Sequence, residues 1–146
     1  MLKSSALEFN EKYASTTGFT FDNLTGDYYR FDEASHQYPA LKFHYEFWDD
    51  DGVIYASLHT AHLPTENQND RNLNLILKIH SFSSYIIKEI RRQFDPFALC
   101  KVNLICDEDE ENTYNTHIIN FVCKNDPSYN ADLMHELVKA TRKFKI

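Results

Sequence analysis

Apolar and polar residues alternate on both sides of the segment Asp49–Gly52, and this pattern predicts a β-hairpin. The two strands cover Leu41–Trp48 and Val53–Thr60. The segment between them holds three aspartates and a glycine, a composition typical of a turn. We therefore expect a hairpin whose tip carries concentrated negative charge.

The two alternations of this hairpin agree on which face is buried. Pairing Trp48 with Val53 would place Phe43 beside Leu58, so the apolar residues of both strands share one side of the sheet. The other side is mostly polar, and Trp48 and Tyr55 lie on it near the tip. Two alternatives stay open for this second face, since a helix could cover it or a partner could bind it. Its residues are Lys42, His44, Glu46, Trp48, Tyr55 and His59.

Apolar residues at helical spacing predict a helix near each end of the chain. The first covers residues 4–15, with Gly18 as its stop. The last follows Asp126 and Pro127, because proline suits the first position of a helix. Its C-terminal end is rich in lysine and arginine, which the helix dipole favours there. The apolar stripes are Leu2, Ala6, Phe9 and Tyr13 in the first helix and Leu133, Leu137, Ala140 and Phe144 in the last.

The middle of the chain predicts a strand followed by a helix. Apolar and polar residues alternate over residues 73–79, which predicts a strand, although a helix from Asn72 is an alternative. Helical spacing then covers residues 82–94, with Ser81 or Ser83 as the cap.

A second hairpin follows this helix. Its strands cover Cys100–Cys106 and Tyr114–Cys123, and the acidic run Asp107–Glu111 forms its tip. In this arrangement one face of the hairpin is shared by Val102, Leu104, Ile119 and Phe121.

The predicted order of elements is α-βββ-α-ββ-α. It suggests a single α+β domain over residues 1–146, with helices packed on one face of an antiparallel sheet. Residues 19–38 stay ambiguous, with Thr20-Phe21 and Tyr28–Phe31 as candidate short strands.

Composition supports one packed domain and narrows the class of partner. The chain has 146 residues, 42% of them hydrophobic, and a net charge of −7. Repulsion from phosphates argues against nucleic-acid binding, whereas an acidic surface favours a basic protein partner. The alternative is that this charge only keeps a small domain in solution.

The cysteines and the N-terminus predict a cytoplasmic protein. Cys100, Cys106 and Cys123 occur without a CxxC motif, which favours free thiols in a reducing compartment. The first residues lack the apolar run of a signal peptide. No segment approaches the roughly 20 apolar residues of a membrane span, so we expect no membrane partner.

Negative charge is concentrated in two clusters, each between two predicted strands. This arrangement suits a protein that touches a cationic partner more than one that turns over a substrate. Tryptophan and tyrosine beside the first cluster are favoured interface anchors. The predicted partner-binding residues are Trp48, Asp49, Asp50, Asp51, Tyr55, Asp107, Glu108, Asp109, Glu110 and Glu111.

No residue pattern predicts catalysis, a metal or a cofactor. The chain lacks a Gly-x-Ser-x-Gly elbow and phosphate-binding glycine loops, and Asp107–Glu111 lacks the glycine of a calcium loop. His59 and His62 would point to opposite faces of one strand. His44 and His59 would lie diagonally across the hairpin, with Glu46 as the one further candidate ligand. We therefore expect no catalytic residue, no metal and no cofactor.

The segment Ile86–Arg92, followed by Cys100–Cys106, an acidic tip and a helix after Pro127, carries a resemblance to a known family. From Leu41 to Phe144 the chain resembles class I type III secretion chaperones and the related YbjN-like domains in element order, size and acidic balance. The resemblance implies a non-enzymatic dimer that docks an extended segment of one exported partner through apolar grooves and edge-strand addition. It would place the dimer contact on the second helix and the second hairpin.

Two further functions stay open. An immunity or antitoxin protein would plug the active site of a basic, nuclease-type toxin with Asp49–Asp51 and Asp107–Glu111, and Trp48 or Tyr55 would anchor it. A small enzyme of unknown chemistry is the third. The leading expectation is a module that sequesters one protein partner, basic or exported, with a homodimer as an open alternative.

Overall fold

Six antiparallel strands and three helices make up this computed structural model, which describes residues 2–25, 28–35, 41–62, 69–94, 100–108 and 113–143. The predicted fold class, a single α+β domain with an antiparallel sheet, is confirmed. The elements are α1 (Leu2–Thr17), β1 (Asp22–Thr25), β2 (Tyr28–Ala34), β3 (Leu41–Asp50), β4 (Val53–His62), α2 (Asn69–Gln93), β5 (Cys100–Glu108), β6 (Thr113–Val122) and α3 (Pro127–Thr141).

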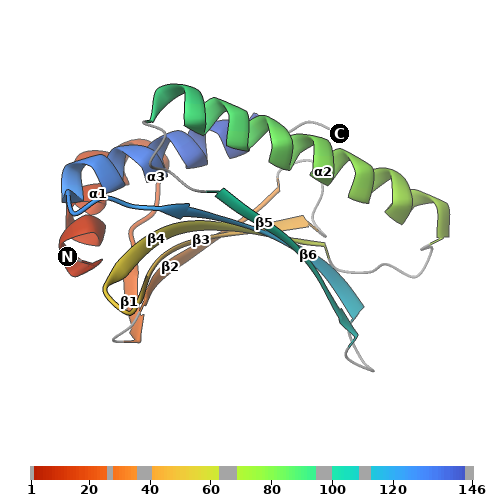
Figure 1. Cartoon of the computed structure of the whole chain (residues 1–146), viewed down its shortest axis with the longest axis horizontal. Coiled ribbons are helices and arrows are strands. Elements are labelled where there is room, and N and C mark those ends of the chain that lie inside the picture. Colours follow the sequence, from red (N-terminus) through yellow and green to blue (C-terminus); the bar gives the residue numbers. More distant parts are fainter. Residues whose placement is uncertain are drawn as a thin grey trace.

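The helices lie together on one side of the sheet, as Figure 1 shows. The strand order is β1-β2-β3-β4-β6-β5, and β1 and β5 are its edges. In Figure 1 the strands bend away from the helices toward both ends, so the face without helices is concave. Among the residues that the structure describes, no helix combines the length and the apolar composition that a membrane crossing requires.

The core lies between the helices and the apolar face of the sheet. The alternation predicted for β3 is confirmed, because its odd-numbered residues from Leu41 to Phe47 are all buried. Aromatic rings join α1 to the sheet, with Phe9 and Phe31 stacked at 5.8 Å and Phe31 and Tyr45 at 4.8 Å. Such ring pairs stabilise a core by about 0.5–1.5 kcal/mol each beyond the area they bury.

The ends of α1 and α3 follow the sequence prediction. Gly18 stops α1 with φ +86°, and its N–H donates to the carbonyl of Ala14 at 2.9 Å. The Asp126 carboxylate caps α3 by accepting from the N–H groups of Ser128 and Tyr129 at 3.1 and 3.2 Å. Of the predicted stripe of α3, Leu133, Leu137 and Ala140 are buried, and Phe144 lies outside the described residues.

The register predicted for the first hairpin is wrong by two residues. Trp48 pairs with Tyr55 rather than with Val53, because both strands continue further and leave only Asp51 and Gly52 in the turn. These two residues have φ values of +53° and +84°, the left-handed conformations that a two-residue type I′ turn requires. A shift of two residues preserves the faces, so the predicted buried and polar faces are both confirmed.

The predicted strand over residues 73–79 is also wrong, because these residues belong to α2. The chain has no glycine or proline from Asn69 to Phe94, so nothing interrupts a helix there. Leu77, which an alternating strand would have buried, is 56% exposed. Ser81 and Ser83 lie inside the helix and do not cap it. The buried stripe follows helical spacing at Ile79, Phe82, Ile86 and Ile90.

Four strands rather than three precede α2. The ambiguous region contributes β1 and β2, which take the place of the strand expected after the first hairpin. The second predicted hairpin is confirmed as β5 and β6, with Val102 opposite Ile119.

Candidate functional site

The concave face of the sheet is the candidate site. Among the described residues, no helix covers this face (Figure 1). Of the two alternatives left open by the sequence, a covering helix is therefore not observed, and the face is free to bind a partner. Trp48 and Tyr55 are both partly exposed on it. We define the open face by Tyr28, Arg30, Asp32, His44, Glu46, Trp48, Tyr55, Ser57, His59 and Asn120.

The strand register orders these side chains into three rows across the sheet. Because residues opposite each other on neighbouring strands share a face, each row brings together side chains that are distant in the sequence. The rows are Asp32, His44 and His59; Arg30, Glu46, Ser57 and Asn120; and Tyr28, Trp48 and Tyr55.

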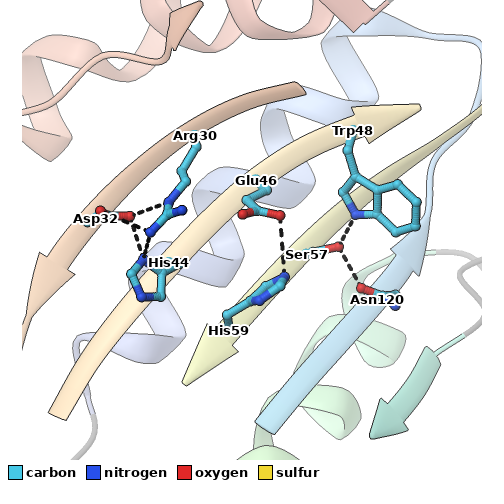
Figure 2. Close-up of polar contacts among 8 residues, drawn as sticks. All are labelled: Arg30, Asp32, His44, Glu46, Trp48, Ser57, His59 and Asn120. Atoms are coloured by element: carbon cyan, nitrogen blue, oxygen red, sulfur yellow. Dashed lines mark hydrogen bonds and ion pairs between the residues drawn. The ribbon is translucent and has the colours of Figure 1, made fainter. Parts of the chain in front are cut away.

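In the first row, Asp32 binds both an arginine and a histidine (Figure 2). Arg30 Nε donates to Asp32 Oδ1 at 2.8 Å, and His44 Nδ1 lies 2.5 Å from the same oxygen. Burial raises the pKa of the Asp32 carboxyl, but hydrogen bonds from Arg30 and His44 outweigh it and hold this pKa below its usual range. The hydrogen bond with Asp32 in turn raises the pKa of Arg30.

A second carboxylate and histidine lie beside the first pair. Glu46 Oε2 is 3.3 Å from His59 Nε2, and the two side chains are 17% and 25% exposed. Burial raises the pKa of Glu46, but the hydrogen bond and charge of His59 outweigh it and lower this pKa below its usual range. His44 and His59 are directly opposite each other, not diagonal as the predicted register implied, and their ring centroids are 6.5 Å apart.

A hydrogen-bonded chain holds the tryptophan at the other end of the face. Trp48 Nε1 donates to Ser57 Oγ at 2.5 Å, and Ser57 Oγ donates to Asn120 Oδ1 at 2.6 Å (Figure 2). Trp48 also stacks on Tyr55, with ring centroids 4.4 Å apart and planes inclined by 16°. The aromatic pair is therefore fixed in one orientation while part of its surface stays exposed.

The structure places the first acidic cluster beside this aromatic pair. Asp49 and Asp50 end β3, Asp51 starts the turn, and all three are exposed. Asp49 Oδ1 accepts from the N–H of Gly52 at 2.9 Å, so this carboxylate also shapes the turn.

The second acidic cluster lies toward the opposite end of the strands. Asp107 and Glu108 end β5, and Asp109–Glu111 lie outside the described residues. Tyr55 of β4 pairs with Val122 near the end of β6, whereas Glu108 pairs with Thr113 at its start. Asp107 and Glu108 therefore do not form one site with the first cluster.

Sequence reasoning missed five residues of the open face: Tyr28, Arg30, Asp32, Ser57 and Asn120. The alternation of Tyr29 and Phe31 with Arg30 and Asp32 is a signal for a strand, and it continues beyond the predicted segment Tyr28–Phe31. Ser57 and Asn120 gave no signal, because their contact depends on the pairing of β4 with β6.

A shallow cleft of about 230 Å³ lies between α2 and α3, outside the open face. Five charged side chains line it, and four of them pair within their own helices, Arg92 with Glu89 and Lys139 with Glu136. Lys143 is the fifth, and one further exposed lysine gives no chemical reason to assign a ligand.

Within the described part of the chain, no group of three or more His, Cys, Asp or Glu residues is arranged to hold a metal ion. Comparison with family models, with curated proteins and with solved structures gave no match.

Proposed function

We propose that this protein is a non-catalytic module that sequesters one protein partner, and that the open face with the Asp49–Asp51 tip is its docking surface. The observation that carries the proposal is a concave, uncovered sheet face that ends in a partly exposed aromatic pair beside exposed carboxylates. Aromatic anchors next to charged residues are characteristic of protein interfaces.

The hydrogen bonds of the open face support binding without large rearrangement. Trp48 is held by Ser57 and by Tyr55, so little side-chain freedom remains to be lost when a partner docks. The carboxylates of the tip would attract a basic partner and accelerate its encounter.

The secretion-chaperone version of this proposal rests on the element order and on a sheet edge. The helices and the antiparallel sheet follow the order that carried the resemblance, with one additional strand before α2. The edge strand β5 extends over nine residues, Cys100–Glu108, and its outer edge could pair with an extended segment of an exported partner.

The immunity version rests on the exposed carboxylates of the first tip. Asp49, Asp50 and Asp51 are exposed at the tip of the hairpin and could enter the cationic active site of a nuclease-type toxin. Because Asp107 and Glu108 end a strand toward the other end of the sheet, only one cluster would act as the plug.

A cytoplasmic location is part of the proposal, because the protein must meet its partner before export or toxicity. Cys123 supports a reducing compartment. It is a free cysteine, and burial raises the pKa of its thiol to about 12, so it is kept as an unreactive core residue.

The test is capture of the partner from the native cells at low salt, followed by binding measurements on variants. We expect one stoichiometric protein partner.

Asp50→Lys should weaken binding at least about tenfold, which corresponds to roughly 1.4 kcal/mol. Asp50 is the most suitable tip residue, since Asp49 shapes the turn and Asp51 has a positive φ. Tyr55→Ala should weaken binding by a similar factor through loss of the aromatic pair.

Glu11→Lys is the matched control, because Glu11 is an exposed residue of α1 and its reversal changes the net charge equally. Capture of a secreted protein through a non-globular segment supports the chaperone version, and capture of a basic nuclease domain supports the immunity version. The proposal fails if no partner is captured, or if Asp50→Lys and Tyr55→Ala bind as tightly as Glu11→Lys.

A further inference from the structure

An aromatic row crosses three strands at one end of the open face. Tyr28 of β2 lies opposite Trp48 of β3, and Trp48 lies opposite Tyr55 of β4. Trp48 and Tyr55 are stacked at 4.4 Å, so each of these two rings keeps one face that the stack does not use. All three residues are partly exposed. The row therefore offers π surface to a group that approaches from the concave side.

The polar atom of the tryptophan already has a partner. Trp48 Nε1 donates to Ser57 Oγ at 2.5 Å, and Ser57 Oγ donates to Asn120 Oδ1 (Figure 2). A binding partner therefore gains nothing by offering the indole a hydrogen-bond acceptor. The group that the ring can still attract is one that interacts with the negative face of a π system, which is a cation.

Carboxylates flank the aromatic row on both sides along β3. Glu46 and Asp50 lie two residues before and after Trp48, on the same face and each about 7 Å from it along the strand. Glu46 already binds His59 Nε2 at 3.3 Å. Asp50 is exposed, and in the described part of the chain it forms neither a hydrogen bond nor an ion pair. Asp50 is thus a carboxylate without a cation beside an aromatic stack.

The protein pairs an aromatic ring with its own cation elsewhere but not on the open face. Arg142 lies over Phe19, with its guanidinium carbon 5.1 Å from the ring centroid. Among the residues that the structure describes, no lysine or arginine lies over Trp48 or Tyr55. Arg30, which lies on the open face, makes two hydrogen bonds to a carboxylate of its own strand. The cation that complements the aromatic row must therefore come from another molecule.

The arrangement favours a guanidinium over an ammonium. The donors of a guanidinium lie in its plane, so it can stack on a ring and donate two hydrogen bonds to a carboxylate at the same time. It is also less strongly hydrated than an ammonium, so it loses less on leaving water.

We propose that the aromatic row and Asp50 form a recognition site for an arginine side chain of a protein partner. The site rests on the proposed function and deepens it, because it names the group of the partner that the docking surface selects. Stacking on the rings would supply the preference for arginine, and Asp50 would fix the direction from which the side chain enters.

The test is a fluorescence titration of the untagged chain with three capped tripeptides, which carry arginine, lysine or citrulline between two glycines. Trp48 is the single tryptophan, so its emission reports on this site. We expect a saturable change with the arginine peptide. The lysine peptide should bind about three- to tenfold more weakly. The citrulline peptide keeps the shape of arginine without its charge and should bind at least about tenfold more weakly.

Two variants separate the parts of the site. Asp50→Asn should weaken binding of the arginine peptide about two- to fivefold, because the charge of the carboxylate is lost. Tyr55→Leu should weaken it by a similar factor, because leucine keeps apolar bulk but has no π face. Glu11→Gln is the matched control, because it removes one exposed carboxylate from α1, on the helical side of the sheet, and should leave binding unchanged.

The inference is overturned if the lysine or citrulline peptide binds as tightly as the arginine peptide, or if Asp50→Asn binds it no more weakly than Glu11→Gln. Partner capture tests the proposed function separately. A captured partner whose contact with the open face contains no arginine would overturn the arginine site and leave the docking surface in place. Selective binding of the arginine peptide without any captured partner would support the site and remove the proposed function.

Discussion

Gly52 determines the register on which the open face depends. Its φ of +84° is a left-handed conformation, and a Cβ built there would meet nothing within 4 Å. The cost of a side chain at this position is therefore backbone strain rather than collision. A residue with a Cβ pays about 1–2 kcal/mol for this conformation.

We expect Gly52→Ala to lower the free energy of unfolding by about 1 kcal/mol, measured by urea denaturation. Asp51→Asn is the matched control, because asparagine tolerates the left-handed conformation at the neighbouring position and should be close to neutral. Equal destabilisation by both substitutions would contradict a type I′ turn as the origin of the register.

Asp126 stabilises one element, the helix α3, because its carboxylate accepts hydrogen bonds from two N–H groups at the start of that helix. Asp126→Ala should lower the free energy of unfolding by about 1 kcal/mol. Asn125→Ala is the control, since Asn125 is an exposed neighbour outside the cap. If the two variants unfold at the same denaturant concentration, the cap does not stabilise the helix.

Elements with one consistent period were predictable from the sequence, and mixed periods were not. The faces of β3 and β4 followed from strict alternation, and α1 and α3 followed from helical spacing with Gly18 and Asp126 as end signals. Residues 73–79 combine an alternating pattern with helix-forming residues, and the absence of any glycine or proline up to Phe94 was the better evidence.

The candidate site was predictable only in part, because it depends on register and on strand order. Alternation placed His44, Glu46 and His59 on one face, but the Asp51-Gly52 turn signal was needed to bring the histidines opposite each other. Ser57 contacts Asn120 because β4 pairs with β6. These two strands are separated in the sequence by α2 and β5, so no local sequence pattern predicts their pairing.

At the scale of the whole molecule, the net charge of −7 is unevenly distributed. Carboxylates are exposed at the tip of the first hairpin, whereas the outer surface of α2 and α3 is rich in exposed cations. This asymmetry would direct a basic partner toward the sheet and away from the helices. The exposed cations of α2, of α3 and of the turn after α3 are Lys78, Lys88, Arg91, Arg92, Lys139, Arg142 and Lys143.

The contact between the helix layer and the sheet contains a buried histidine. His117 of β6 is 1% exposed, lies opposite Thr60 of β4, and has the ring of His80 from α2 at 4.5 Å. Within the described part of the chain, neither of its ring nitrogens has a hydrogen-bond partner. Burial, together with the charge of His80, lowers the pKa of His117 from 6.5 to about 4.

This histidine should make the fold sensitive to mild acid. Below pH 6.5 the unfolded chain binds a proton at His117, whereas the folded chain binds it only near pH 4. The free energy of unfolding therefore decreases as the pH is lowered from about 6.5 to about 4. We expect a loss of about 2 kcal/mol from His117 between roughly pH 7 and pH 5, measured by urea denaturation. His117→Leu should remove this share, while His135, whose pKa is also lowered by burial, still contributes in this variant. If His117→Leu loses as much free energy of unfolding on acidification as the unmodified protein, α2 does not keep this ring neutral in the folded protein.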